Sequence, residues 1–430
     1  MAMFKDYIRK QLEKRVKQYF AAHPEVKLIV VTGSAGKISA KRAIADVLSQ
    51  KYRVRMTDGA AYNPEIAMLL GMLGIRYPEK KKSISQWWAV LRAAKKRVKQ
   101  PTDADIVIQE LYTSKPGDMA RFATFMLPNI AVVTSITPEH MDVFGTIEAV
   151  AQEELSITSY AKHTLINRDD IESRFSQFVL APHFSTYGTS GIAEYHFEIE
   201  DFSPDAGYKG LVVAPEFPDG FASKLHVVGE YSIRPVMAAV ASAVKYGMPP
   251  EEIAKGVEAI RPAPGRMNLL SGIGNTKILA ATYTPPPITS RAALPPLYSF
   301  DSASMRVAVF ADMVNLGQMS QVEHAELGRL CDPGELAWVV TVGPESEQYL
   351  APAARARGCQ VKSFATAMQA GQFVRSVTEE GAAVLVKGPK DSFYMEEAVK
   401  ILCNMSADTQ LVRQGADWVM RKSAYFETFK

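Results

Sequence analysis

The stretch Leu28-Ile-Val-Val-Thr-Gly-Ser-Ala-Gly-Lys-Ile-Ser-Ala-Lys41 decides the fold. Four apolar residues run directly into a glycine-rich turn, and a segment with helical spacing follows. A buried strand that delivers such a turn to a helix N-terminus is typical of a phosphate-binding loop, because glycines let the backbone approach phosphate oxygens and a lysine supplies positive charge. The stretch therefore predicts a nucleotide site whose binding residues include Thr32, Gly33, Gly36 and Lys37.

One position departs from the usual loop. The residue after the lysine is ordinarily Ser or Thr, because its hydroxyl coordinates a magnesium ion. Here that residue is Ile38, which has no ligand atom. Ser39 follows and is the hydroxyl candidate for both nucleotide and metal contact.

The composition is that of an ordinary globular protein with two or three domains: 430 residues, 47% hydrophobic and 22% charged. The three cysteines, Cys331, Cys359 and Cys403, are widely spaced and predict neither a disulfide framework nor a metal motif. The first ten residues are charged throughout, so we expect neither a signal peptide nor a membrane span, and a cytoplasmic location. The net charge of +3 is too small to indicate nucleic-acid binding.

Strand and helix patterns alternate along the chain, which predicts an α/β protein. We expect a P-loop parallel-sheet central domain over residues 26–262 and a second, Rossmann-like α/β domain over 263–430. Residues 1–25 predict a basic amphipathic helix. The proline-rich connector Arg261–Arg266 marks the boundary between the two large domains, and residues 195–228 predict a small antiparallel extension.

Two chemically capable side chains follow predicted strands. Glu110 ends the strand 105–111, and His140 comes shortly after the strand 130–136. Because doubly wound sheets bind ligands at the carboxyl ends of their strands, both residues are candidates for metal or substrate contact.

Residues 80–99 are the most basic part of the chain and place tryptophans at helical spacing. One interpretation is a helix packed by its tryptophans with a solvated basic face. The other is an adaptor surface for an anionic membrane, a nucleic acid or a protein partner.

Taken together, these pieces resemble the Mur ligase family of ATP-dependent amide-forming enzymes over about residues 27–405. Within that family they are most similar to the type that adds D-alanyl-D-alanine to a UDP-linked muramoyl tripeptide. The motifs that carry the resemblance are Thr32–Lys37, Glu110 with Lys115–Asp118, Pro128–Thr134 leading to His140 and Phe144-Gly145, Gly265-Arg266, Ala311–Met313 with Leu316-Gly317 and His324, and Val386–Gly388.

The resemblance implies that ATP phosphorylates a substrate carboxylate and that an amine then displaces the acyl phosphate, as two domains close over the substrates. It implies that Lys37 holds the ATP phosphates, that Glu110 and His140 serve magnesium, and that Arg266 and Asp312 contact nucleotide. The implied partners are a UDP-muramoyl peptide and D-alanyl-D-alanine. Only about 26 residues precede the loop strand, so we expect the family's N-terminal domain for the UDP-sugar to be missing in large part.

Several departures from the family pattern fall on chemical positions. Besides Ile38, they are Glu154 in place of a carbamylated lysine that partners magnesium, Ser135 in place of an asparagine, Ala280–Pro287 in place of an acidic and asparagine-rich segment, and Glu230–Pro235 in place of a histidine and asparagine pair. Two alternatives stay open: an active ligase in which Glu154 takes a catalytic position, and an inactive homologue that acts as a binding or scaffold protein, with other cell-wall enzymes as partners.

Overall fold

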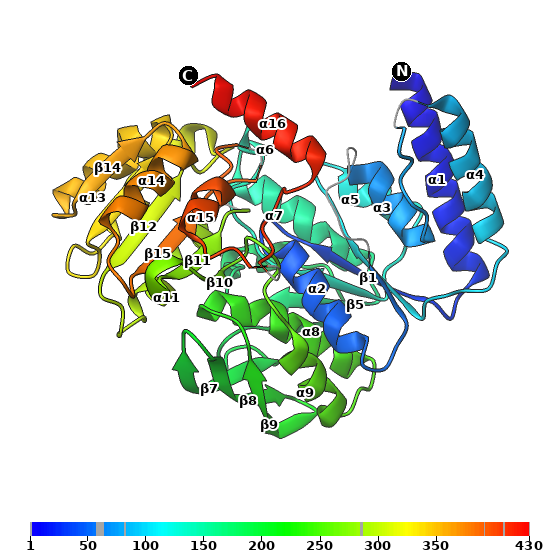
Figure 1. Ribbon diagram of the computed structural model, residues 1–430. Helices are drawn as coiled ribbons and strands as arrows, with labels where there is room; N and C mark the ends of the chain where they lie inside the picture. The colour runs from blue at the N-terminus through cyan, green and yellow to red at the C-terminus, as the bar shows by residue number, and fades with distance from the viewer. Residues whose placement is uncertain are drawn as a thin grey trace.

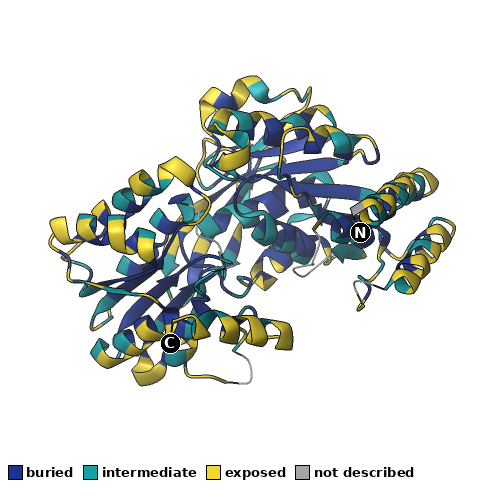
Figure 2. Ribbon diagram, turned by 90° about the horizontal axis from the view of Figure 1, so that it is seen from above, coloured by how far each residue is buried: buried dark blue, intermediate teal, exposed yellow. Residues whose placement is uncertain are grey.

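The structure is a computed structural model that describes residues 2–56, 64–80, 83–283, 287–390, 392–406 and 409–429. Two six-stranded sheets and one three-stranded sheet form its framework, with helices on the faces of the two large sheets (Figure 1). Figure 2 shows the strands of the large sheets buried between helices whose outer surfaces are exposed.

The first large sheet is wholly parallel, in the order β2-β3-β1-β4-β5-β6. Helices cover both of its faces, so its strands are continuous apolar runs rather than alternating ones. In β1, Ile29 and Val31 pack with α2 and α8, whereas Leu28 and Val30 pack on the opposite face with α1 and α3. The strands are β1 (Lys27–Thr32), β2 (Val54–Met56), β3 (Ile106–Glu110), β4 (Ile130–Val133), β5 (His163–Asn167) and β6 (Phe184–Tyr187).

Nine α-helices are described in the first part of the chain. They are α1 (Ala2–Ala22), α2 (Lys37–Leu48), α3 (Pro64–Leu73), α4 (Ile84–Arg97), α5 (Asp118–Ala123), α6 (Met141–Phe144), α7 (Ile147–Leu155), α8 (Ile233–Lys245) and α9 (Pro250–Ala259). Before α8, the strands β7 (His196–Ser203), β8 (Gly207–Ala214) and β9 (Phe217–Leu225) form an antiparallel sheet. This sheet is the small extension that the sequence predicts.

The second large sheet has the order β10-β11-β15-β12-β13-β14 and is parallel except for the edge strand β10. Its strands are β10 (Asn268–Ser271), β11 (Lys277–Ala281), β12 (Arg306–Ala311), β13 (Trp338–Val342), β14 (Val361–Phe364) and β15 (Ala383–Lys387). Its helices are α10 (Pro287–Arg291), α11 (Leu294–Tyr298), α12 (Ser320–Arg329), α13 (Ala351–Ala356), α14 (Ala367–Val377), α15 (Glu396–Leu402) and α16 (Ala416–Glu427).

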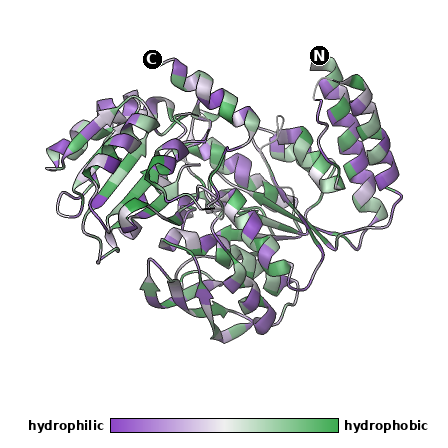
Figure 3. Ribbon diagram, in the orientation of Figure 1, coloured by the Kyte–Doolittle hydropathy of each residue, from purple (hydrophilic) through white to green (hydrophobic). Residues whose placement is uncertain are grey.

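These observations confirm the predicted fold class, since both large sheets carry the strand cores that appear as apolar runs in the sequence (Figure 3). The division into residues 1–25, 26–262 and 263–430 stays a prediction. On one side of the junction, Lys277 Nζ of β11 lies 2.6 Å from the carboxylate of Asp205, which is in the turn between β7 and β8. Among the described residues, no helix combines the length and the apolar character needed to cross a membrane.

Candidate active site

The phosphate-loop motif connects β1 to α2. Gly33 and Gly36 have φ values of 114° and 83°, which L side chains rarely adopt. A Cβ at Gly33 would lie 2.5 Å from Thr134 Oγ1 and 2.8 Å from two backbone atoms of Ser135. The loop therefore requires glycine at this position because it is pressed against the turn that follows β4.

That turn also supplies hydrogen-bond acceptors to the loop. The Ser34 N–H donates to the Ser135 carbonyl at 2.9 Å, and the Ala35 N–H donates to Ser135 Oγ at 2.8 Å. Ser135, which stands where the family pattern has an asparagine, thus fixes the loop by both its backbone and its hydroxyl. The first-turn amides of α2 lack intrahelical partners, and no side chain caps this helix.

Glu154 of α7 is a buried anchor of the same loop. Its Oε2 accepts hydrogen bonds from the Thr32 hydroxyl and, at 2.9 Å, from the Gly33 N–H, while its Oε1 accepts one from the Thr113 hydroxyl. The residue is 2% exposed. At the position of the expected carbamylated lysine, the structure places a carboxylate whose two oxygens are both engaged by protein donors.

Lys37 bends back over the loop. Its ammonium donates to the Gly33 carbonyl and lies 3.8 Å from Glu139 Oε2. Burial alone would lower the pKa of Lys37, but the charges of Glu139, Glu154 and Glu110 together outweigh it and leave that pKa above its ordinary value. Lys37 is therefore positively charged at neutral pH, as a phosphate-binding lysine must be.

Two of the predicted metal residues, Glu110 at the end of β3 and His140 in the loop after β4, each lie beside another charged group. Glu110 Oε2 lies 3.7 Å from Lys41 Nζ of α2, and His140 Nε2 lies 3.9 Å from Glu139. Burial raises the pKa of Glu139, an effect that Lys37 opposes. In the part of the chain that the structure describes, no three His, Cys, Asp or Glu side chains are grouped closely enough to hold a metal. The metal roles of Ser39, Glu110 and His140 stay predictions.

A cavity of about 120 Å³ lies between the loop helix and the second large sheet. Gly36 and Ser39 line it from the loop side, and Arg266 and Lys387 line it from the other side. The Arg266 guanidinium stacks over the Tyr283 ring, 4.5 Å from its centroid, and burial lowers the pKa of Arg266. Burial, with a smaller effect of the Arg266 charge, lowers the pKa of Lys387 to about 7.

The segment that replaces the histidine and asparagine pair forms the wall of this cavity. Arg234 donates to Asp169 at 3.1 Å and to Asp170 at 2.6 Å, and Asp170 also accepts from Asn167 at 2.8 Å. Burial raises the pKa of Asp170, and the neighbouring Arg234 charge opposes that effect. Arg234, Asp170 and Asn167 line the cavity, so this wall is charged and hydrogen-bonded.

Asp312 is placed differently from Arg266. Its carboxylate accepts the backbone N–H of Ser346 at 2.7 Å and that of Glu345 at 3.2 Å, at the start of a short π-helical turn, Ser346–Leu350. Burial raises the pKa of Asp312. Asp312 is not among the described residues that line the cavity, and its predicted contact with nucleotide stays a prediction.

The prediction from sequence missed Glu139, Lys41, Thr113 and Lys387 as members of the site. Glu139 directly precedes His140, and Lys387 ends β15, so the argument from strand ends applies to both. Lys41 and Thr113 carry no comparable signal. Of the replaced segment Ala280–Pro287, residues 284–286 lie outside the described residues.

Residues 31–243 match the model of the Mur ligase middle domain. The chain belongs to the Mur ligase family. It is 25% identical over 320 residues to the UDP-N-acetylmuramoyl-tripeptide–D-alanyl-D-alanine ligase of Bacillus subtilis, covering 74% of this chain and 63% of that protein. With the Treponema pallidum protein of the same name it shares 26% identity over 331 residues, covering 76% of this chain and 64% of that protein. The chain thus spans less than two thirds of the length of these curated Mur ligase relatives.

The fold is also that of solved Mur ligases. The MurF ligase from Thermotoga maritima in complex with ADP matches with a TM-score of 0.74 and 19% identity, over 92% of this chain and 82% of that one. MurF from Acinetobacter baumannii matches with a TM-score of 0.73 and 21% identity, over 91% of this chain and 79% of that one. These likenesses confirm the predicted MurF-like resemblance at the level of the fold.

Proposed function

We propose that this chain is an ATP-dependent ligase of peptidoglycan precursor synthesis that forms an amide bond between a UDP-muramoyl peptide and D-alanyl-D-alanine or a similar amine. The observation that carries the proposal is the cavity at the junction of the two large sheets. Gly36 of the phosphate loop and Ser39 of α2 face it from one side, and Arg266 and Lys387 face it from the other. Such a cavity brings groups from two domains to one anionic ligand.

The loop residues fit a triphosphate. The N-terminus of α2 has no side-chain cap, so its first-turn N–H groups are available to an anion, and Gly36 places no side chain beside them. Lys37 lies next to these groups in its charged form. Arg266 extends the positive charge to the opposite wall of the cavity.

A magnesium ion fits this site only together with the nucleotide. Mg²⁺ is usually held by one or two carboxylates, substrate phosphates and water, so three protein ligands are not required. Glu110 and Glu139 are the carboxylates that would hold it, in competition with Lys41 and Lys37. When bound, the ion would neutralise negative charge on the transferring phosphoryl group.

In the proposed reaction, the terminal phosphoryl group of ATP passes to an oxygen of the substrate carboxylate, which gives an acyl phosphate and ADP. The amine nitrogen then attacks the acyl carbon, phosphate leaves, and the nitrogen loses a proton as the amide forms. The chain itself contributes charge and position. Lys37 holds the phosphates through an ammonium that stays protonated, and Arg266 binds anionic charge from the second domain.

The test is phosphate release measured with ATP, magnesium, UDP-muramoyl tripeptide and D-alanyl-D-alanine. We expect release only when all four are present, and a loss of at least about 100-fold in Lys37→Met. Lys51→Met, on the exposed surface just after α2, is the matched control and should keep full activity. No turnover with any UDP-muramoyl peptide and amine would refute the proposal.

A specific observation favours a second candidate function, an inactive homologue that binds a cell-wall enzyme. Glu154 already engages the Gly33 N–H and the hydroxyls of Thr32 and Thr113, and Ile38 offers no hydroxyl to a metal. Strong ATP binding that depends on magnesium would contradict this candidate. A variant with Ile38→Thr, Glu154→Lys and a restored 280–286 segment completes the test, since turnover in that variant alone would identify a decayed catalyst.

A further inference from the structure

Helices α1 and α4 form a pair at the outer edge of the molecule, away from the proposed active site (Figure 1). The Tyr7 and Trp88 rings lie 6.3 Å apart near the N-terminal ends of the two helices. Arg97 lies 5.6 Å from the centre of the Tyr19 ring near their C-terminal ends. The two helices therefore run parallel and side by side.

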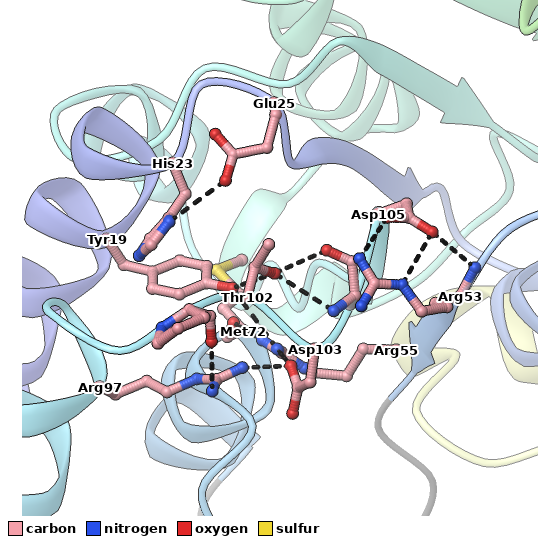
Figure 4. A network of polar contacts seen from close by, with 12 residues as sticks. Tyr19, His23, Glu25, Arg53, Arg55, Met72, Arg97, Thr102, Asp103 and Asp105 are labelled. Carbon is pink, nitrogen blue, oxygen red and sulfur yellow. Dashed lines mark hydrogen bonds and ion pairs between the residues drawn. The ribbon is translucent and has the colours of Figure 1, made fainter.

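The pair is fixed firmly to the central sheet. Its inner face buries Ile8, Leu12 and Val16 of α1 in the core. At the C-terminal ends of the helices, Asp103 accepts hydrogen bonds from both Arg97 and Arg55 (Figure 4). The orientation of the outer face is therefore set by the fold and does not depend on a partner.

The N-terminal end of this outer face carries four exposed apolar side chains. Met3 is 88% exposed, Tyr7 42%, Ile84 61% and Trp88 46%. We call these four residues the apolar tip. Trp87, the neighbour of Trp88, is 6% exposed and packs edge-on against Tyr77, so only one of the two tryptophans belongs to the core.

Cations continue the same helical faces beyond the apolar tip. Four of them follow Tyr7 or Trp88 in steps of three or four residues and so lie on the same stripes of the two helices, and Lys99 lies in the turn just after α4. These exposed residues, which we call the basic stripe, are Lys10, Lys14, Arg92, Lys95 and Lys99.

Little negative charge opposes the basic stripe. Helix α4 contains no Asp or Glu. On α1, Asp6 pairs with Arg9 and Lys10, and Glu13 pairs with Arg9 and Arg121. The outer face thus combines an apolar aromatic end with a net positive body.

We propose that the apolar tip and the basic stripe form a docking surface for an anionic lipid bilayer. Tryptophan and tyrosine favour the headgroup level of a bilayer, where Met3 and Ile84 reach the acyl boundary. Each lysine or arginine close to an anionic leaflet adds about 1 kcal/mol, or roughly fivefold in binding. A nucleic acid would use the cations but would leave Met3 and Ile84 in water.

The test uses the full chain and vesicles of phosphatidylcholine, with and without about one third phosphatidylglycerol. We expect flotation only with the anionic vesicles, and binding that falls as salt rises. Lys95→Glu with Lys99→Glu should weaken binding by roughly 30-fold or more, since two favourable charges of about fivefold each are lost. The matched control, Lys209→Glu with Lys255→Glu, makes the same change of net charge at exposed sites elsewhere and should bind like the unmodified chain.

The apolar contribution needs a second pair of variants. Ile84→Ser with Trp88→Ser should weaken binding by at least about tenfold, whereas Val419→Ser with Met420→Ser, which removes exposed apolar groups from α16, should not.

Three results would overturn the proposal: no flotation with anionic vesicles, equal losses in the control variants, or salt-dependent binding to duplex DNA without vesicle binding. The assay contains neither ATP nor a peptide substrate, so its outcome is independent of the proposed ligase activity.

Discussion

Replacing Glu154 with alanine tests how the phosphate loop is held. The change removes a buried carboxylate that accepts from the Thr32 hydroxyl, the Gly33 N–H and the Thr113 hydroxyl. A hydrogen bond to a charged group contributes about 1.5–3 kcal/mol, and a buried donor left without a partner costs about 1–3 kcal/mol. The two hydroxyls are able to rotate toward other acceptors, but the backbone N–H is not. We therefore expect a loss of about 3 kcal/mol in unfolding free energy.

Differential scanning calorimetry measures this effect. For a domain of about 150–250 residues, 1 kcal/mol shifts the midpoint by about 2–4 °C, so Glu154→Ala should lower the midpoint of the domain that contains the loop by about 6–12 °C. Glu148→Ala is the matched control on the same helix, because Glu148 is half exposed and its ion pair is with exposed Arg174. Its shift should stay within about 2 °C. Equal shifts in the two variants, or less than about 2 °C for Glu154→Ala, would refute this account of the loop.

Three further perturbations follow from the structure. Because its pKa is lowered to about 7, Lys387 binds more protons in the unfolded state than in the folded state between about pH 7 and 10, so its contribution to stability rises with pH over that range. Lys387→Met should therefore raise the melting midpoint at pH 6 more than at pH 9.5. Equal shifts at the two pH values would exclude this pH-dependent contribution of Lys387. Gly33→Ala should abolish ATP binding and cost at least about 2 kcal/mol, whereas Gly117→Ala, with φ of 90° but open space around its Cβ, should cost only about 1 kcal/mol in urea unfolding. Arg413→Ala should destabilise by about 2–3 kcal/mol in urea unfolding, since it removes the bidentate partner of the fully buried Glu396 carboxylate and leaves Lys422 as its remaining cation; a loss below about 1 kcal/mol would contradict this.

The sequence predicts the fold well where the signal is local. The apolar runs of β1, β3, β4, β12 and β15 are long and buried on both faces, so composition alone marks them. The edge strands β6 and β10 were missed. β6 is only four residues long and alternates exposed with buried positions, and β10 pairs antiparallel, outside the repeating pattern.

The candidate site is less predictable because its contacts are long-range. The glycines and Lys37 of the loop follow from one short motif. The role of Glu154 does not, because its partners Thr32 and Gly33 lie more than a hundred positions away in the chain. The same holds for Lys41 beside Glu110, which meet only because α2 passes the end of β3. Asp312 is the opposite case. A family motif predicts that it contacts nucleotide, but its carboxylate accepts hydrogen bonds from the backbone N–H groups of Ser346 and Glu345 in its own domain.

The ion pair between Lys277 and Asp205 links the second large sheet to the small antiparallel one. Both side chains are partly exposed, at 36% and 56%, so the pair contributes at most about 1 kcal/mol and weakens as salt screens it. On this side of the junction Phe202 of β7 also packs against the apolar core of the second large sheet, so the ion pair is the weaker of the two contacts there. Rising ionic strength would therefore weaken the polar part of this junction and leave its apolar part in place.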